Sequence, residues 1–183
     1  MAVSFTEIAP DALVDLVNGW GALPRQGDGR ADAPHRAVSS LTRRLSLPTR
    51  VNSALTVRTL ADAADRLHAV FAAQNGEACA RELTRLLTNT GVRPAMEAGA
   101  SGSLGAAWSV DSAKQVLPAA AAITLRQFLA DRGFDRIGVC TGGHCADVYL
   151  DQSPAGRRRF CSVTCQNRAR VAAFRRRRAD AVG

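Results

Sequence analysis

The segment CTGGHCADVYLDQSPAGRRRFCSVTCQNRARVAAFRRRR, residues 140–178, contains four of the five cysteines of the chain and its densest run of arginine. The cysteines form two pairs, Cys140 with Cys145 and Cys161 with Cys165. Each pair is close enough in sequence to bind one metal ion, and the 15 residues between the pairs can close into a loop around it. The spacing therefore predicts one structural zinc ion, Zn²⁺, held by four thiolates.

Two other uses of these residues are weaker. Two disulfides among these cysteines would leave Cys79 unpaired, and the N-terminus shows no apolar leader. We therefore expect reduced cysteines in a cytoplasmic, nucleoid-associated protein. Cys79 is expected in the core. His144 is the alternative ligand, but it adjoins Cys145, and both side chains could hardly reach one ion without strain. We therefore expect His144 at the surface.

The second cysteine pair predicts the start of a helix. Cys161 and Cys165 are four residues apart, which places both on one helix face, and Ser162 can cap the first turn. Residues 163–178 contain neither Gly nor Pro and are rich in Ala and Arg, so a helix is expected over this range. Phe174 is expected to pack back on the metal module.

The net charge of +8 resides entirely in the C-terminal segment. Residues 1–151 contain 15 basic and 15 acidic residues, whereas from residue 152 onward nine arginines face Asp180 alone. Such a cluster needs full solvation or a polyanionic partner, and DNA offers phosphates suited to bidentate arginine contacts. The alternative to a polyanion-binding role is a basic tail that is fully solvated.

The metal segment resembles the CGNR-type zinc finger of bacterial proteins that also carry an ABATE domain and are taken to be transcription regulators. The resemblance rests on an aromatic, an Asp and a Ser after the first cysteine pair, two basic residues and an aromatic before the third cysteine, and a final Asn and Arg. Here these are Tyr149, Asp151, Ser153, Arg158, Arg159, Phe160, Asn167 and Arg168. The sequence departs from the family in having Gln166 for Gly and three residues between its last two cysteines.

The first 135 residues are mainly helical in pattern. We predict helices at 9–20, 36–47, 53–74, 77–89 and 113–132, a loop at 23–36, and a β-hairpin from the runs 92–97 and 104–110. The expected architecture is a mainly α N-terminal domain with a small β-hairpin, residues 1–135, followed by a treble-clef-like zinc module with a basic helix, residues 136–183. The order of elements, the motif LVDLVN at 13–18 and Trp108 resemble the ABATE domain. A sensor role for this domain, with a small-molecule effector, is compatible with the sequence.

These observations predict a zinc-dependent, sequence-specific transcription regulator that binds double-stranded DNA. Its helix would lie in the major groove, with the side chains near base edges coming from Asn167, Arg168 and Arg170, and those on phosphates from Arg157, Arg158, Arg159, Arg175, Arg176, Arg177 and Arg178. A structural pair of Asp151 with Arg168, or with Arg159, would orient that helix. The alternative is a zinc-stabilised module that binds RNA or a protein such as RNA polymerase.

Enzymatic function is not expected. Four thiolates leave zinc no open position for water, and His35 and His68 are isolated in sequence from one another, so no triad is evident. His68, on a strongly periodic helix, is expected to be capped or at the surface. No apolar run is long enough to span a bilayer, so no membrane partner is predicted, whereas a homodimer is compatible with the sequence.

Overall fold

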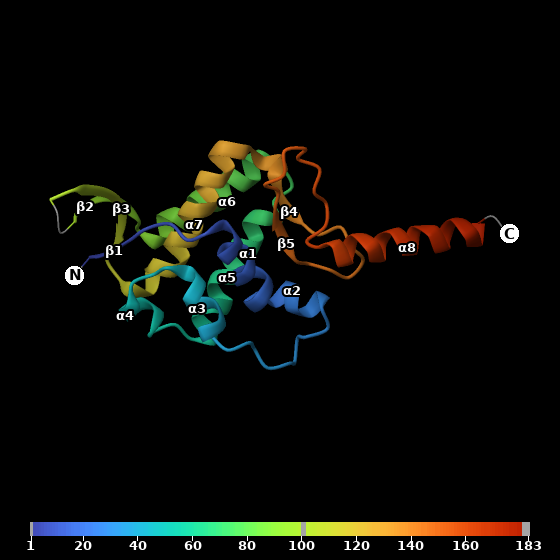
Figure 1. The fold of residues 1–183 in the computed structure, drawn as a ribbon, viewed down its shortest axis with the longest axis horizontal. Coiled ribbons are helices and arrows are strands. Elements are labelled where there is room, and N and C mark those ends of the chain that lie inside the picture. The colour runs from blue at the N-terminus through green and yellow to red at the C-terminus, as the bar shows by residue number, and fades with distance from the viewer. Residues whose placement is uncertain (1, 100–101, 181–183) are drawn as a thin grey trace.

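The structure is a computed structural model that describes residues 2–99 and 102–180 (Figure 1). The helices are α1 (Pro10–Trp20), α2 (Ala22–Gly27), α3 (Ser39–Leu45), α4 (Thr49–Asn52), α5 (Val57–Phe71), α6 (Gly76–Thr90), α7 (Ala113–Arg132) and α8 (Val163–Asp180), with a 3-10 turn η1 (Phe134–Arg136). The strands are β1 (Val3–Phe5), β2 (Arg93–Ala98), β3 (Leu104–Val110), β4 (Ile137–Val139) and β5 (Val148–Leu150). The predicted mainly α architecture with small sheets is confirmed.

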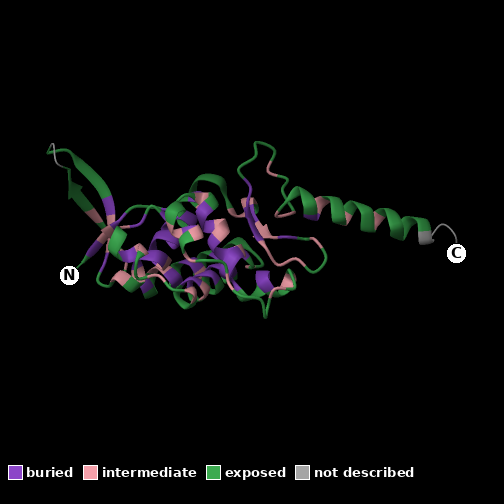
Figure 2. Ribbon diagram, turned by 60° about the horizontal axis from the view of Figure 1, so that its bottom comes forward, coloured by how far each residue is buried: buried purple, intermediate pink, exposed green. Residues whose placement is uncertain are grey.

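Helix α7 forms the centre of the hydrophobic core. Every residue from 119 to 125 is buried, because α1, α5 and α6 all pack against this helix. Its run of alanines lets the neighbouring helices approach closely, and a helix that is apolar on all sides is expected in a core. Figure 2 shows the buried positions gathered in this bundle, while α8 is almost entirely exposed.

The predicted hairpin forms and gains a third strand. β2 and β3 pair antiparallel, and β1 adds to the other edge of β3 with Val3 opposite Val110. The sheet is covered by helices only near β1, since Val3, Phe5 and Val110 are buried whereas β2 is almost wholly exposed. The distal part of the hairpin therefore extends away from the bundle (Figure 2).

The predicted loop at 23–36 begins as a helix instead. α2 contains Pro24 and Arg25, both of which are buried. The Arg25 side chain donates to the carbonyl oxygens of Arg30 and Ala33, so it holds the following turn against the helix. This helix has only six residues, too few to show a helical periodicity in the sequence. Burial of its short inner face stabilises it, so the loop prediction was wrong for these residues.

The hairpin β4–β5 joins the core of the helical bundle. Ile137, Val148 and Leu150 belong to the same buried cluster as the helices, and β5 packs on α1. The Asn18 side chain pairs with the backbone of Val148 in both directions, donating to its oxygen at 3.0 Å and accepting from its nitrogen at 2.7 Å. The hydrophobic core thus continues across residue 135, where the sequence predicts a domain boundary.

Helix α8 leaves the molecule after its first turn. Cys165 is buried, but Val171 and Phe174 are about half-exposed, and the helix extends freely from the bundle in Figures 1 and 2. The expectation that Phe174 packs back on the metal module is therefore wrong, since its side chain is 54% exposed. No helix within residues 2–99 and 102–180 is long and apolar enough to cross a membrane.

Candidate metal centre

The four predicted cysteines converge on one point. Their sulfur atoms all lie within 4.8 Å of one another. The Sγ atom of Cys161 is 3.7 Å from that of Cys145 and 3.5 Å from that of Cys165. Zinc–sulfur bonds of about 2.3 Å in a tetrahedron place the sulfurs roughly 3.8 Å apart, so the cluster has the size of a tetrathiolate zinc site.

The first two ligands come from a tight turn between β4 and β5. The Cys140 nitrogen donates to the Asp147 oxygen at 2.8 Å, which closes the turn, and the Gly142 nitrogen donates to the Cys140 sulfur at 3.4 Å. The Cys145 nitrogen donates to the Gly142 oxygen at 3.1 Å. A backbone N–H group that donates to sulfur stabilises the thiolate form. His144, in the same turn, is exposed, as expected.

The last two ligands sit at the start of α8. Cys161 precedes the helix and Cys165 lies in its first turn, with the Ser162 hydroxyl accepting from the Cys165 nitrogen at 3.2 Å. The predicted cap is confirmed. The metal site therefore fixes the start of α8.

The segment between β5 and α8 is held by a buried carboxylate. Asp151 is 1% exposed, and it accepts hydrogen bonds from the nitrogen and hydroxyl of Ser153 at 3.0 and 2.6 Å and from the Arg158 nitrogen at 2.9 Å. Burial alone would raise the pKa of Asp151, but the hydrogen bonds from Ser153 and Arg158 outweigh it and lower the pKa below its ordinary value. Asp151 is thus a loop organiser.

The predicted pairing of Asp151 with Arg168 or Arg159 is not formed. Its acceptor positions are filled by Ser153 and by the backbone of Arg158, and neither predicted arginine makes an ion pair within the described residues. The three donors, the Ser153 nitrogen and hydroxyl and the Arg158 nitrogen, are uncharged. They can reach the buried carboxylate without the free-energy cost of removing a guanidinium from water.

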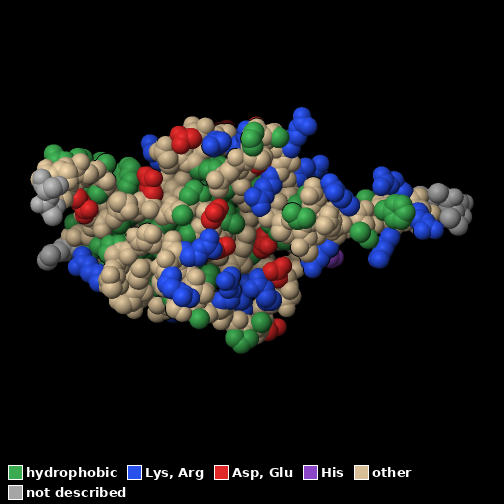
Figure 3. Space-filling view, viewed as in Figure 1, with side chains coloured by type: hydrophobic (Ala, Val, Ile, Leu, Met, Phe, Trp, Pro, Cys, Tyr) green, Lys and Arg blue, Asp and Glu red, His purple; other side chains and the backbone are tan. Residues whose placement is uncertain are grey.

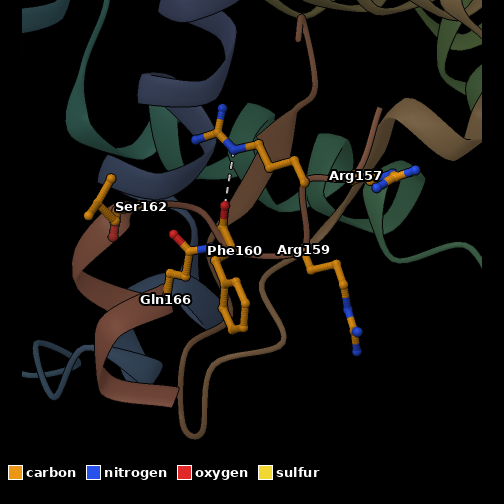
Figure 4. Close-up of a pocket in the computed structure, with 7 residues that line it drawn as sticks. Arg157, Arg159, Phe160, Ser162 and Gln166 are labelled. Atoms are coloured by element: carbon orange, nitrogen blue, oxygen red, sulfur yellow. Dashed lines mark hydrogen bonds between the residues drawn. The ribbon is translucent and has the colours of Figure 1, made fainter. Parts of the chain in front are cut away.

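Arg158, predicted to contact DNA phosphate, makes several contacts within the finger. Its guanidinium donates to the carbonyl oxygens of Phe160 at 3.0 Å, Leu150 at 3.2 Å and Cys161, and it lies 5.8 Å from the centre of the Tyr149 ring. The dashed line in Figure 4 marks the bond to Phe160. Three of its donors therefore tie this loop to the backbone of the third zinc ligand, Cys161.

Within the part of the chain that the structure describes, the side chains of its neighbours Arg157 and Arg159 make no such hydrogen bonds. In Figure 4 both extend away from Gln166 at the start of α8. They line a cavity of about 330 Å³ together with Phe160, Ser162 and Val163. The remaining predicted DNA residues, Asn167, Arg168, Arg170 and Arg175–Arg178, lie exposed along α8.

Burial affects the proton affinity of the ligand thiols. It raises the pKa of Cys145 to about 12 and that of Cys161 in the same direction, whereas backbone hydrogen bonds from Cys161 and Gly142 overcome the burial of Cys140 and lower its pKa. Thiols that hold their protons at neutral pH must release them to a metal. Metal affinity should consequently rise with pH.

Two residues of the helical body contact the metal turn, and sequence reasoning missed both. His68, expected to be capped or at the surface, is only 5% exposed, and its Nε2 atom lies 2.9 Å from the Ala146 oxygen. Gly27 of α2 lies so close that a Cβ atom there would be 2.5 Å from the His144 oxygen. No local pattern could have indicated these contacts, since each spans more than 75 residues.

With this geometry established, the comparisons decide the nature of the module. Residues 136–178 match the family model of the CGNR zinc finger. The C-terminal segment is therefore similar to CGNR zinc fingers. The match and the four clustered sulfurs together assign one structural zinc ion to the site.

The match covers the CGNR finger alone. It does not extend into residues 1–135, so the resemblance of that part to the ABATE domain stays a prediction. No curated protein matches the chain. The CGNR finger is thus the part of the molecule on which a function can be argued.

Proposed function

We propose that the chain is a sequence-specific, double-stranded DNA-binding transcription regulator whose CGNR finger presents α8 to the DNA. The observation that carries this proposal is the geometry of α8. It is an 18-residue helix rich in arginine, it is fixed at one end by two zinc ligands, and it extends away from the bundle (Figure 1). A free helix of this kind fits the major groove of duplex DNA.

Charge supports the same partner. Among the described residues after 151, Arg158 is the one arginine whose side chain donates hydrogen bonds within the finger, and α8 has no acidic residue before Asp180. Arg157 and Arg159 stand at the helix start, where the helix dipole adds to the attraction for phosphate. A strong positive field at one pole of a molecule whose body is neutral steers it to a polyanion.

We include the fold type of the zinc module and the further partners of the regulator in this proposal. The order of zinc-binding turn, strand, loop and ligand-bearing helix supports a treble-clef-like module. A small-molecule effector acting on residues 1–135, a homodimer on a repeated site and contact with RNA polymerase are each compatible with a regulator of this design, and α8 does not depend on them.

Binding of the zinc-loaded full chain to duplex DNA, the matching duplex RNA and single-stranded RNA, over a range of salt concentrations, tests the proposal. We expect tight, salt-sensitive binding to duplex DNA and clear discrimination among DNA sequences. The narrow major groove of duplex RNA excludes a helix, so RNA should bind more weakly. Equal or tighter binding to RNA, or retention of a protein partner with no DNA binding, would favour the alternative function.

A further inference from the structure

The exposed face of α8 has a neutral strip along its centre. Thr164, Asn167, Val171 and Phe174 recur at intervals of three and four residues, which places them on one side of the helix. Val171 is 49% exposed and Phe174 54% exposed, although both are apolar. A groove of about 470 Å³ runs along this side and includes Thr164, Asn167 and Val171 in its lining.

Arginines border this strip on both sides. Arg168 and Arg175, seven residues apart, line the same groove on one side, and Arg170 and Arg177, also seven apart, fall on the other by helical periodicity. Figure 3 shows apolar surface on the projecting helix with blue side chains above and below it. The helix thus has two parallel rows of positive charge separated by a strip that can make apolar contacts and, at Asn167, paired hydrogen bonds.

This pattern matches the cross-section of the DNA major groove. Phosphates line both edges of the groove, and base edges form its floor, where thymine exposes a methyl group and adenine offers the N6 donor and N7 acceptor. Val171 and Phe174 supply apolar surface for the methyl group, and an Asn side chain pairs with both adenine atoms. The major groove of duplex RNA is too deep and narrow for side chains of a helix to reach its floor.

Resting on the proposed DNA-binding function, we propose that α8 reads A·T base pairs in the major groove, with Val171 contacting a thymine methyl group and Asn167 pairing with an adenine. Phe174 extends the apolar contact by one turn, and its ring is within 5.9 Å of the Arg178 guanidinium. Arg168 and Arg170 then sit beside the floor and hold the two backbones. The target is therefore a DNA site that contains A·T pairs. Its sequence specificity comes mainly from these pairs and not from contacts with guanine.

The test begins with selection of binding sites by the zinc-loaded full chain from a pool of short randomised duplexes. In the most enriched duplex, each thymine is replaced in turn by deoxyuridine, which removes only the methyl group. At one thymine we expect affinity to fall about fourfold for the wild type and hardly at all for Val171→Ala, since that variant has already lost the contact. Replacing one adenine by 7-deazaadenine should similarly weaken the wild type but not Asn167→Ala, and here the loss should be about tenfold.

Arg176→Ala is the matched control, because residue 176 lies five positions beyond Val171 and faces away from the strip. This variant should lower the affinity for the thymine duplex and for the deoxyuridine duplex by the same factor. Val171→Ala should not unfold α8, since the side chain is exposed and Ala is the better helix former.

Three outcomes overturn the inference. Enriched duplexes without a common A·T pair would do so, as would thymine and deoxyuridine duplexes that bind equally to the wild type. A methyl-group effect that persists unchanged in both Val171→Ala and Phe174→Ala would place the contact elsewhere. In each of these cases DNA binding itself stands, whereas failure to retain any duplex removes the proposed function as well.

Discussion

Adjacent arginines in the CGNR finger have different tasks, and their hydrogen bonds distinguish them. Arg158 gives its donors to three carbonyl oxygens beside the metal site, while Arg159 contributes only its backbone oxygen, which accepts from the nitrogen and hydroxyl of Thr141 at 2.9 and 3.0 Å. A side chain with its donors engaged inside the protein stabilises the fold, and one extending into solvent is available to a ligand.

We predict that Arg158→Ala lowers the stability of the finger by on the order of 1–2 kcal/mol, because three carbonyl contacts are lost at a partly exposed position. Zinc transfer to a chelator should accelerate in this variant. Arg159→Ala is the matched control: it should leave the melting temperature and the zinc release rate unchanged while weakening DNA binding. The reverse pattern would show that the two roles are interchanged.

The buried carboxylate of Asp151 yields a second prediction, on pH. Asp151→Asn should destabilise the chain by about 1–3 kcal/mol at neutral pH, because an amide cannot accept all three donors. The folded-state pKa of Asp151 lies below its ordinary value, so its contribution is fully present above the unfolded pKa of about 3.9 and is lost as pH falls through the lower, folded value.

Denaturant titrations of wild type and Asp151→Asn from neutral to acidic pH measure this contribution. The difference between their free energies of unfolding should shrink only below about pH 4. A difference that is constant across this range would mean that the carboxylate charge has no part in holding the loop.

At the scale of elements, α8 depends on the zinc site. The helix has 18 residues with six arginines, and most of its length projects away from the bundle (Figure 1). Isolated helices of this length are marginal in water, so the ordered state of α8 must come from Cys165 and the cap at Ser162. The hairpin β4–β5, in contrast, is held by the core of the bundle.

Cys161→Ser should therefore separate the two elements. We expect the bound zinc to fall from one ion per chain to none, the helical circular dichroism signal of α8 to be lost, and the bundle to keep its cooperative thermal transition. Elemental analysis and circular dichroism measure both effects. Cys79→Ser is the control, since that cysteine is buried in α6 away from the metal, and its zinc content should remain at one.

For the whole molecule, the finger and the helical body form one unit. Asn18, Gly27 and His68 each contact the hairpin or the metal turn, so the direction of α8 is fixed relative to the bundle at its base. A change in the bundle can reach the finger through these contacts. These contacts are a physical route by which the helical body could regulate the finger.

Gly27→Ala tests that coupling. The added Cβ atom would lie 2.5 Å from the His144 oxygen, so α2 and the metal turn must separate, and zinc should leave more rapidly although every ligand remains. Gly143→Ala is the matched control in the same turn, because a Cβ atom there meets nothing within 4 Å. Identical zinc release from the two variants would show that α2 does not support the turn.

The salt dependence of binding measures the whole basic pole. If about six phosphates are neutralised, the logarithm of affinity should fall with the logarithm of salt at a slope of about −5. Each Arg→Ala change at a phosphate-contacting position should flatten the slope by nearly one unit, whereas Arg158→Ala should leave it unchanged if the finger stays folded. A slope near zero would contradict an electrostatic interface.

The sequence alone determined the local features of this protein. Cysteine spacing predicted all four zinc ligands, apolar periodicity located the long helices, Ser162 was identified as a cap, and charge counting placed the positive pole on the last helix. These signals can be read because their partners are near in sequence, where spacing alone restricts the geometry.

Tertiary structure decided what those local pieces contact. Burial placed His68 and Gly27 against the metal turn, gave Asp151 neutral partners in place of an arginine, and drew β4–β5 into the core of the bundle. It also left Phe174 exposed on a free helix. The physical reason is that such contacts join residues far apart in the chain, and their energies depend on which surfaces are removed from water together, a property that appears only once the whole chain has packed.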